Sequence, residues 1–448
     1  MRTFLPWLLA SLTTLSAFVV NNHPSLGMNA DGEVVVIWQN YDRDTEDYKV
    51  QGATFSIGES WSAPVTISGV RISPQFPSVA LNASGDMFAV WQAYVGRDLV
   101  LESATGLFVS GWDASEVIGE ATGQHMFPDV GVDASGNAIA VCQAREGTFF
   151  ISQATLYNAS LQSWGEPAAL NTPTVTMPLP VAVMSNAVGF SVWSQYFGAK
   201  QGIECASISL DLEEEGPIVV SDRAFNANNP EVAVNGMGTL AVVWERAAGS
   251  SLLIEAIVRE GGDFGEVSVL SSTSFLSANP IVAINENGTA VVVWQSAFPS
   301  DITKQVIQAA MYVNGSWGVP KTISSEQQLS ENPRVAINAS GEAVFIWEAN
   351  NMVQTAFFSS ATITTLSDPT EVTSHPQIGI DSMGNAVAVW DVVIGDDTEI
   401  RAAVFSGGVW GVPEVISQKR EMNLFSRVLY YEKAEESARI YRTRPRAR

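Results

Sequence analysis

The chain has 448 residues, of which only 16% are charged, and its formal net charge at pH 7 is −24. A chain of this length can bury a large core, which excludes a disordered protein and a miniprotein stapled by disulfides. Its two cysteines exclude a disulfide framework and a four-cysteine zinc site. The acidity disfavours nucleic acids and anionic membranes as partners, because both are negatively charged.

The first twenty residues have the pattern of a signal peptide. Arg2 supplies a positive charge, residues 4–17 are apolar, and Ser16 and Ala17 offer a small-residue cleavage point. No other segment approaches the ~20 apolar residues that span a bilayer, so no integral membrane segment is expected in the mature chain. Residues 1–20 therefore predict a secreted, periplasmic or cell-surface protein; an apolar N-terminal strand and an uncleaved anchor are the alternatives.

Residues 21–417 contain a tandem repeat in eight copies. The bulky residue that marks each copy recurs at steps of 53, 51, 51, 51, 50, 53 and 43 residues. These residues are Trp38, Trp91, Cys142, Trp193, Trp244, Trp294, Trp347 and Trp390. Every copy except the fourth has glycine six positions earlier, Asn or Asp nine positions earlier and proline fourteen positions earlier. The repeat therefore sets the architecture of nearly the whole chain.

Each copy has the pattern of four antiparallel strands. In the sixth copy these are residues 280–285, 289–295, 306–313 and 321–324. An Asx residue followed by glycine suits the first hairpin turn, and proline is expected to open the first strand, where its missing N–H costs least. Eight such units predict an all-β fold, an eight-bladed β-propeller, with a β-solenoid as the alternative.

A second aromatic residue marks the third turn of six copies and is often followed by glycine and proline. These residues are Trp61, Trp112, Trp164, Phe264, Trp317 and Trp410. A surface of this many aromatic residues would suit the stacking of sugars or nucleotides. Their fixed place in the repeat favours a structural role instead.

The order of these motifs resembles the repeats of secreted bacterial propellers of the Tol-system periplasmic type. Trp-Gly-x-Pro, as at residues 164–167, is followed by a strand, a loop, a proline-led strand, an Asx-Gly turn and a strand ending in an aromatic. The resemblance covers residues 21–417 and implies the propeller architecture. The pattern departs from sialidase propellers, whose tryptophan lies closer to the glycine, and from protease propellers, which carry a separate hydrolase domain.

Polar residues directly precede the repeat proline in five copies. In the resembling propellers the first strand is the innermost one, which would place these side chains around one mouth of the central channel. They are the candidates for ligand binding: His23, Asn229, Asn279, Asn332 and His375. The alternative is a polar rim without a ligand.

Acidic residues cluster in the loop between the second and third strands of copies one and eight, which are neighbours in a closed ring. Oxygen-rich loops suit Ca²⁺, whereas the nearby histidines would favour a transition metal. The candidate ligands are Asp42, Asp44, Asp47, Asp396 and Asp397. The loops lack the glycine and terminal glutamate of an EF-hand, so a solvated acidic surface is the competing interpretation and no cofactor is otherwise expected.

The two cysteines lie in neighbouring copies. Cys142 replaces the tryptophan of copy three, and Cys205 lies in the third strand of copy four. An exported chain would permit a disulfide between them, and two buried free thiols are the alternative.

The C-terminal segment 418–448 differs from the repeats. It contains nine basic and four acidic residues, whereas the rest of the chain is strongly acidic. Apolar residues such as Leu424, Val428 and Tyr431 recur at three-to-four spacing, which predicts a helix over residues 423–442. A frayed extension is the alternative.

The sequence contains no nucleophile elbow, zinc-protease helix or P-loop. We therefore expect a non-catalytic, monomeric propeller that binds a protein partner as an assembly scaffold. The alternative is a glycan-binding or glycan-hydrolysing propeller, with carbohydrate as its ligand. Two carboxyl groups beside an aromatic residue at the channel mouth would favour that alternative.

Overall fold

The computed structural model describes residues 21–42, 47–69, 72–174, 179–210, 214–360, 362–395 and 397–417, which form strands and turns. The predicted signal peptide (1–20) and the predicted helical tail (418–448) lie outside the described residues. Within the described ranges, no helix has the length and apolar character needed to cross a membrane.

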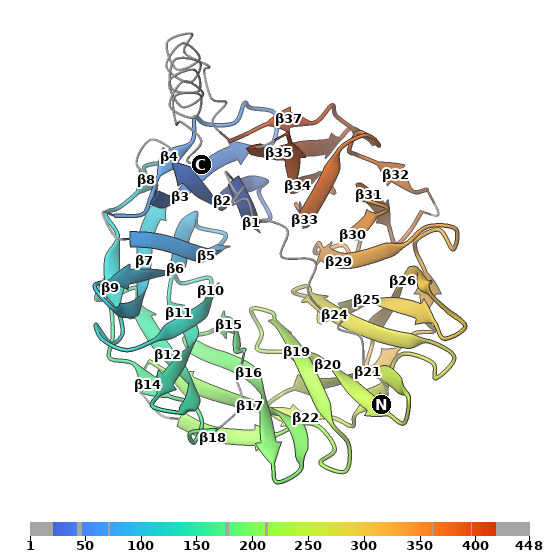
Figure 1. Ribbon diagram of the computed structural model, residues 1–448, viewed down its shortest axis with the longest axis horizontal. Coiled ribbons are helices and arrows are strands. Elements are labelled where there is room, and N and C mark those ends of the chain that lie inside the picture. Colours follow the sequence, from blue (N-terminus) through green and yellow to red (C-terminus); the bar gives the residue numbers. More distant parts are fainter. Residues whose placement is uncertain are drawn as a thin grey trace, which may run out of the picture. The chain divides into compact units, whose positions relative to one another are not determined.

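The strands form eight antiparallel sheets, or blades, arranged in a ring (Figure 1). The innermost strands are β1 (Asn21–Met28), β5 (Ile72–Leu81), β10 (His125–Val132), β15 (Val181–Ser185), β19 (Ala227–Val234), β24 (Leu276–Ile284), β29 (Ser330–Ile337) and β33 (Val372–Ile380). The second strands are β2 (Glu33–Asp42), β6 (Asp86–Val95), β11 (Ala138–Glu146), β16 (Val188–Phe197), β20 (Leu240–Ala248), β25 (Ala290–Phe298), β30 (Ala343–Ala349) and β34 (Ala386–Ile394).

The third strand of each blade pairs with one or two outer strands, most of them short. The third strands are β3 (Asp47–Ser56), β7 (Asp98–Leu107), β12 (Phe149–Asn158), β17 (Lys200–Ser209), β21 (Ser251–Glu260), β26 (Asp301–Val313), β31 (Met352–Phe357) and β35 (Asp397–Ser406). The outer strands are β4 (Val65–Thr66), β8 (Gly111–Trp112), β9 (Glu116–Ile118), β13 (Ser163–Trp164), β14 (Ala168–Ala169), β18 (Glu214–Val219), β22 (Asp263–Phe264), β23 (Ser268–Val269), β27 (Ser316–Trp317), β28 (Lys321–Thr322), β32 (Thr364–Thr365), β36 (Val409–Trp410) and β37 (Glu414–Val415).

Each blade comes from one repeat copy, so blades 1 to 8 follow the chain order and share no strand. The chain is an eight-bladed β-propeller, as the repeat predicted. The core consists of eight apolar clusters, one at each junction between neighbouring blades. The tryptophans of the second strands are fully buried there because two apolar sheet faces meet at each junction. They are Trp38, Trp91, Trp193, Trp244, Trp294, Trp347 and Trp390.

The repeat proline does not open the innermost strand, contrary to the prediction. In blade 6, for example, β24 begins at Leu276 and Pro280 lies inside it, where the pairing with β25 shifts between Ala278 and Ile281. This is a β-bulge, which takes the proline nitrogen out of the hydrogen-bond ladder and so removes the cost of its missing N–H.

The Asx residue of the first turn connects neighbouring blades. Asn29 accepts backbone hydrogen bonds from Asp31 and Glu33 through its Oδ1, which closes the turn. Its Nδ2 donates to the carbonyl of Asn82, the Asx residue of blade 2, at 3.2 Å. The same donation recurs from Asn82, Asn235, Asn285 and Asn338. Asn and Asp differ here, because Asp lacks the donor.

We call this series of hydrogen bonds between neighbouring blades the relay. At two junctions the Asx residue is Asp, which cannot donate, and other groups make the hydrogen bond to the next blade. At the junction of blades 3 and 4, Asp133 accepts from the N–H of Ala187 at 2.8 Å. At the junction of blades 8 and 1, the hydroxyl of Ser382 donates to the carbonyl of Ala30 at 2.7 Å. Blades 4 and 5 are joined by the hydroxyl of Ser185. Side-chain hydrogen bonds therefore connect all eight blades in a circle.

Candidate functional site

The residues before the repeat proline share one backbone conformation and ring one mouth of the central channel. Seven of them have φ between 49° and 53°, in the left-handed region that non-glycine residues seldom adopt. They are His23, Phe76, Phe127, Asn229, Asn279, Asn332 and His375. Because the bulge pushes each residue out of the ladder, its side chain is available at the rim. We call this ring the channel mouth; it includes all five predicted candidates.

One half of the channel mouth consists of aromatic rings from blades 8, 1, 2 and 3. The ring centroids of His375 and His23 lie 4.3 Å apart, those of His23 and Phe76 5.8 Å, and those of Phe76 and Phe127 5.3 Å. These four residues form a continuous arc, which we call the aromatic half. It exposes ring faces and edges on which an apolar ligand surface can pack.

The other half consists of the exposed side chains of Asn229, Asn279 and Asn332, from blades 5, 6 and 7. We call it the amide half. The Nδ2 of Asn229 and the N–H of Asn279 both donate to Oε1 of Glu245, at 2.9 and 2.8 Å. Glu245 follows the buried tryptophan and thus connects the rims of two blades.

At other junctions, too, the residue after the buried tryptophan accepts hydrogen bonds from residues of the channel mouth. Glu348 accepts from Nδ2 of Asn332 in its own blade and from the N–H of His375 in the next, both at 3.2 Å. Gln92 accepts from the N–H of Phe127 at 2.9 Å. Sequence reasoning missed these supports, although a polar residue follows the marker position in every copy.

A cavity of about 550 Å³ opens below the amide half. Besides the three asparagines, its walls include Glu231 from β19 and Arg334 from β29. Both side chains occupy the position after the repeat proline; protein atoms surround them on most sides, and only a part of each surface is open to the cavity. Glu231 and Arg334 face one confined space from blades 5 and 7, with Ile281 of blade 6 between them.

The Glu231 carboxyl has a strongly raised pKa. Burial raises its pKa from 4.5 to about 7; the charge of Asp129 adds to the rise, and Arg334 opposes it. Burial lowers the pKa of Arg334, while Glu231 and Glu348 raise it. Near neutral pH the Glu231 carboxyl can therefore both give and take a proton.

Asp129 has a structural role beside Glu231. Its two carboxylate oxygens accept from the hydroxyl of Ser78 at 2.8 Å and from the N–H of Ala182 at 2.9 Å, which join blades 2 and 4 to blade 3. Burial raises its pKa against the effect of these hydrogen bonds. Glu231, without a comparable pair of donors, is the better candidate for proton transfer.

The predicted metal site is not assembled by the described residues. Asp44 and Asp396 lie outside them, Asp42 ends β2 and Asp397 begins β35. Asp47 instead uses its Oδ1 to accept from the N–H groups of Tyr48 and Ser73, at 2.8 and 3.0 Å. Over the described ranges, no three His, Cys, Asp or Glu side chains gather as a metal site.

The two cysteines are free and buried, so the predicted disulfide is wrong. Cys142 packs at the junction of blades 2 and 3, whereas Cys205 packs at the junction of blades 4 and 5. Their side chains face different apolar layers and cannot meet. Burial raises the pKa of both thiols to about 12, and Cys142 lies 3.8 Å from Nδ1 of the buried His125. Cys142 and His125 occupy the core where other blades place tryptophan.

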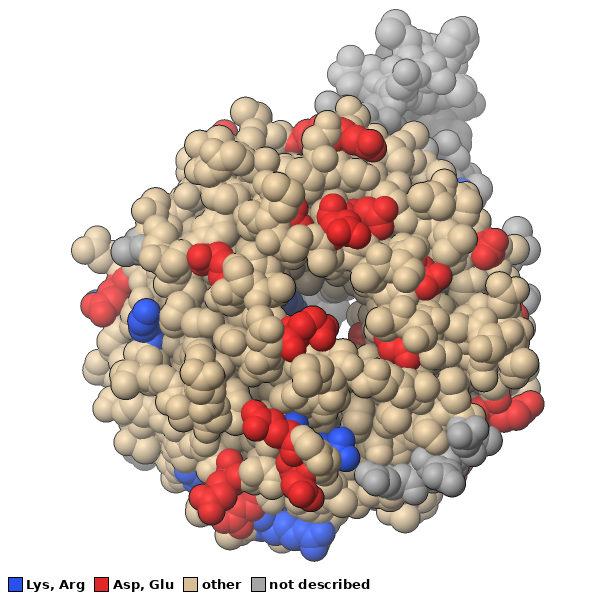
Figure 2. All heavy atoms as spheres, turned by 180° about the vertical axis from the view of Figure 1, so that it is seen from behind, with Lys and Arg blue, Asp and Glu red and all other residues tan. Residues whose placement is uncertain are grey.

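Figure 2 shows an opening at the centre of one face of the ring, with acidic side chains spread around it and few basic ones. No family model and no curated protein matches the sequence. Solved structures do match. An ulvan lyase of a new polysaccharide lyase family, bound to -[GlcA(1-4)Rha3S]-, has a TM-score of 0.50 at 7% identity, over 90% of this chain and 97% of that chain.

A second structure of a lyase of that family also has a TM-score of 0.50, at 9% identity and with the same coverage. Another polysaccharide lyase has a TM-score of 0.48 at 8% identity, over 73% of this chain and 86% of that one. At these identities the likeness establishes the shared fold. The two ulvan lyase structures nevertheless correct the expectation of a scaffold without enzymatic activity, because propellers with this fold include polysaccharide lyases.

Proposed function

We propose that the protein is a carbohydrate-active enzyme that binds a glycan across the channel mouth and cleaves it there. The observation that carries the proposal is the position of Glu231, whose pKa is about 7, in a cavity of about 550 Å³ beside Arg334 and three asparagines. Titratable groups with shifted pKa values in a polar cavity are typical of active sites.

The two halves of the channel mouth suit different parts of a sugar. The apolar face of a sugar ring can pack against Phe76 and Phe127, while its hydroxyls can exchange hydrogen bonds with the amide half. Arg334 offers a guanidinium to any acidic group on the glycan. The lyases that share the fold act on polysaccharides, which supports the same class of substrate.

Glu231 would donate its proton to the glycosidic oxygen as the bond to the leaving sugar breaks. This step is common to hydrolysis and to elimination, so it does not depend on which reaction follows. A carboxyl with a pKa of about 7 remains substantially protonated at neutral pH, unlike an ordinary glutamic acid. In hydrolysis, water adds to the anomeric carbon and releases a proton; in elimination, a base removes the proton next to the uronate carboxyl before or as the C–O bond breaks.

The test is to incubate the protein with neutral and uronate-containing polysaccharides and to measure new reducing ends and ultraviolet-absorbing unsaturated ends. Glu231→Gln should lower kcat by about 10²–10⁴-fold with little change in KM, because Gln keeps the shape but cannot donate the acid proton. Glu59→Gln, at an exposed turn, is the matched control. Full activity of Glu231→Gln, or no cleavage of any polysaccharide, would refute the proposal.

The sequence adds a proposed location. We infer from residues 1–20 that the protein is exported, and from the repeat motifs that it is related to the secreted Tol-type propellers. A glycan-cleaving enzyme outside the cytoplasm would meet extracellular polysaccharides directly. Retention of residues 1–20 and of the protein inside the producing cell would contradict this.

A further inference from the structure

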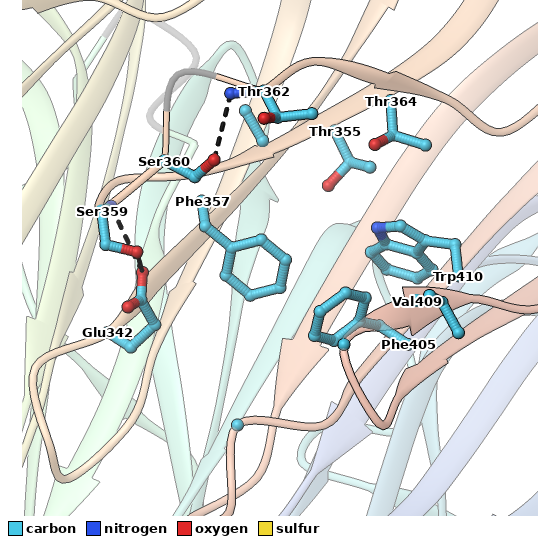
Figure 3. Close-up of a pocket in the computed structure, with 13 residues that line it drawn as sticks. Glu342, Thr355, Phe357, Ser359, Ser360, Thr362, Thr364, Phe405, Val409 and Trp410 are labelled. Atoms are coloured by element: carbon cyan, nitrogen blue, oxygen red, sulfur yellow. Dashed lines mark hydrogen bonds between the residues drawn. The ribbon is translucent and has the colours of Figure 1, made fainter.

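A cavity of about 670 Å³ lies between blades 7 and 8, beside the Asx turns and thus away from the channel mouth (Figure 3). Three aromatic side chains form its apolar wall: Phe357 of blade 7, and Phe405 and Trp410 of blade 8. The centroids of Phe357 and Phe405 are 4.7 Å apart, and those of Phe405 and Trp410 are 5.5 Å apart. We call this cavity the blade 7–8 groove.

The groove corresponds to a space of about 540 Å³ between blades 5 and 6, lined by Tyr312 and Trp317, and it is larger because copy seven is short. Only 43 residues separate Trp347 from Trp390, against 50 to 53 elsewhere. In blades 2, 3, 5, 6 and 8 the third strand pairs with two outer strands. The first of these outer strands contains the aromatic residue of the third turn, for example Trp410 in β36. In the described residues, blades 1, 4 and 7 have a single outer strand, but blade 1 adds Trp61 stacked on Phe55 and blade 4 has the longer β18, whereas β31 of blade 7 pairs on its outer side only with the two-residue β32. The space beside Phe357 is therefore left open.

The neighbouring junction shows how such a space can be closed. Between blades 6 and 7, the ammonium of Lys321 lies 4.2 Å from the ring centroid of Phe358 and covers it. Thr364 is the counterpart of Lys321, since both begin the outer strand and pair with equivalent residues of the third strand. Thr364 is too short to cover an aromatic wall, so the blade 7–8 groove stays accessible.

A buried hydroxyl in the wall lacks a partner. Thr355 is fully buried, lines the groove, and its Oγ1 has no hydrogen bond. An unsatisfied buried hydroxyl is unfavourable, and native structures contain few of them. In Figure 3 this hydroxyl lies on the side of Thr355 that faces Phe357 and Trp410. A ligand hydroxyl that enters between these rings would satisfy it.

The remaining polar groups of the groove indicate which ligand charge it can accept. Four more hydroxyls line the groove, together with the carboxylate of Glu342, which accepts from the hydroxyl of Ser359 at 2.9 Å. They come from Ser359, Ser360, Thr362 and Thr364. The described lining residues include no Lys or Arg, so an anionic ligand would be repelled by Glu342 and by the acidic protein.

We propose that the blade 7–8 groove is a second saccharide-binding site, which takes a neutral sugar ring. Aromatic faces next to several hydroxyls match the apolar face and the hydroxyls of such a ring, and one carboxylate accepts from sugar O–H groups. An extended peptide would instead need unpaired backbone along a full strand. The site binds without cleaving, and it does not depend on the activity of the channel mouth.

The test is calorimetric titration of the full chain with neutral hexasaccharides of gluco, manno, galacto and xylo configuration. Thr364→Lys should copy the cover provided by Lys321 and raise the Kd at least tenfold, whereas Thr365→Lys, on the adjacent exposed residue, should leave it unchanged. Thr355→Val should weaken binding severalfold without lowering the melting temperature, because it removes a hydroxyl that has no partner in the free protein.

Three results would overturn the inference. These are no binding of any hexasaccharide, equal binding by Thr364→Lys and the original chain, and competition by an extended peptide rather than by sugar. Glu231→Gln separates the two proposals. If it abolishes cleavage but leaves this titration unchanged, both sites stand; if it alone abolishes binding, the sugar occupies only the channel mouth.

Discussion

The amide half and the aromatic half of the channel mouth have the same backbone but different side chains. Asn279 and Phe76 both precede the repeat proline and both have φ of 53°. Asparagine tolerates this conformation, whereas a bulky residue such as phenylalanine pays for it. The repeat therefore determines the backbone conformation at this position, whereas the residue type at the position differs between the two halves. Strain of about 1 kcal/mol at each aromatic position is typical of residues retained for a function.

The largest expected effect concerns the charges below the amide half. Arg334→Met leaves Glu231 and Glu348 without a nearby guanidinium. It should lower the free energy of unfolding by about 1–3 kcal/mol at pH 8, which is less than for a fully buried pair because water in the channel screens the charges. Because the folded pKa of Glu231 is raised to about 7, its contribution to stability is full below 4.5 and is lost as pH rises through 7.

The Arg334→Met loss should accordingly be smaller at pH 5, where Glu231 is protonated, than at pH 8. Urea unfolding at the two pH values measures it, and the double variant Arg334→Met/Glu231→Gln should recover most of the loss. An equal loss at both pH values would mean that packing, rather than charge, explains the effect.

A reciprocal exchange tests the difference between the halves directly. Asn279→Phe should lower the free energy of unfolding by about 1 kcal/mol, because it puts a bulky residue at φ of 53°. Phe76→Asn should relieve a similar strain but weaken glycan binding through loss of a ring face. Denaturant unfolding and titration with a cleaved glycan measure the two effects; stronger binding by Phe76→Asn would disprove the assigned role of the aromatic half.

The smallest expected effect lies where the two halves meet, at His375. Its hydrogen bond with Asp391, at 2.9 Å, raises the pKa of His375, whereas burial first and then the charge of His375 lower the pKa of His23. The His375–Asp391 pair therefore stabilises the fold below pH 6.5 and loses this effect as pH rises through the raised pKa.

Asp391→Asn should lower stability by about 0.5 kcal/mol at pH 6, since the imidazole is half exposed, and should have little effect at pH 9. NMR titration of the imidazole protons should show His375 gaining its proton at higher pH than His23. The reverse order would contradict the assignment.

Much of the fold could be predicted because the Trp, Gly, Asx and Pro positions repeat in register. The same register placed Asn229, Asn279 and Asn332 correctly at the channel mouth. The bulge could not be predicted, because a proline inside a strand and a proline that opens one leave the same sequence pattern. Glu231 and Arg334 were missed since their position after the proline has no constant residue type. A site with one residue from each of several blades leaves no contiguous motif, so the sequence alone offered no reason to prefer the glycan alternative over the scaffold.

The circle of side-chain hydrogen bonds closes all eight junctions, whether the donor is an Asn amide, a serine hydroxyl or a backbone N–H. The junction of blades 8 and 1 has a buried apolar cluster like the others, and Ser382 completes the relay there although no peptide bond crosses it. The order of the blades around the ring thus matters more than the point at which the chain starts. Joining residue 417 to residue 21 through a short linker, and opening the chain between any other two blades, should give circular permutants with the same fold.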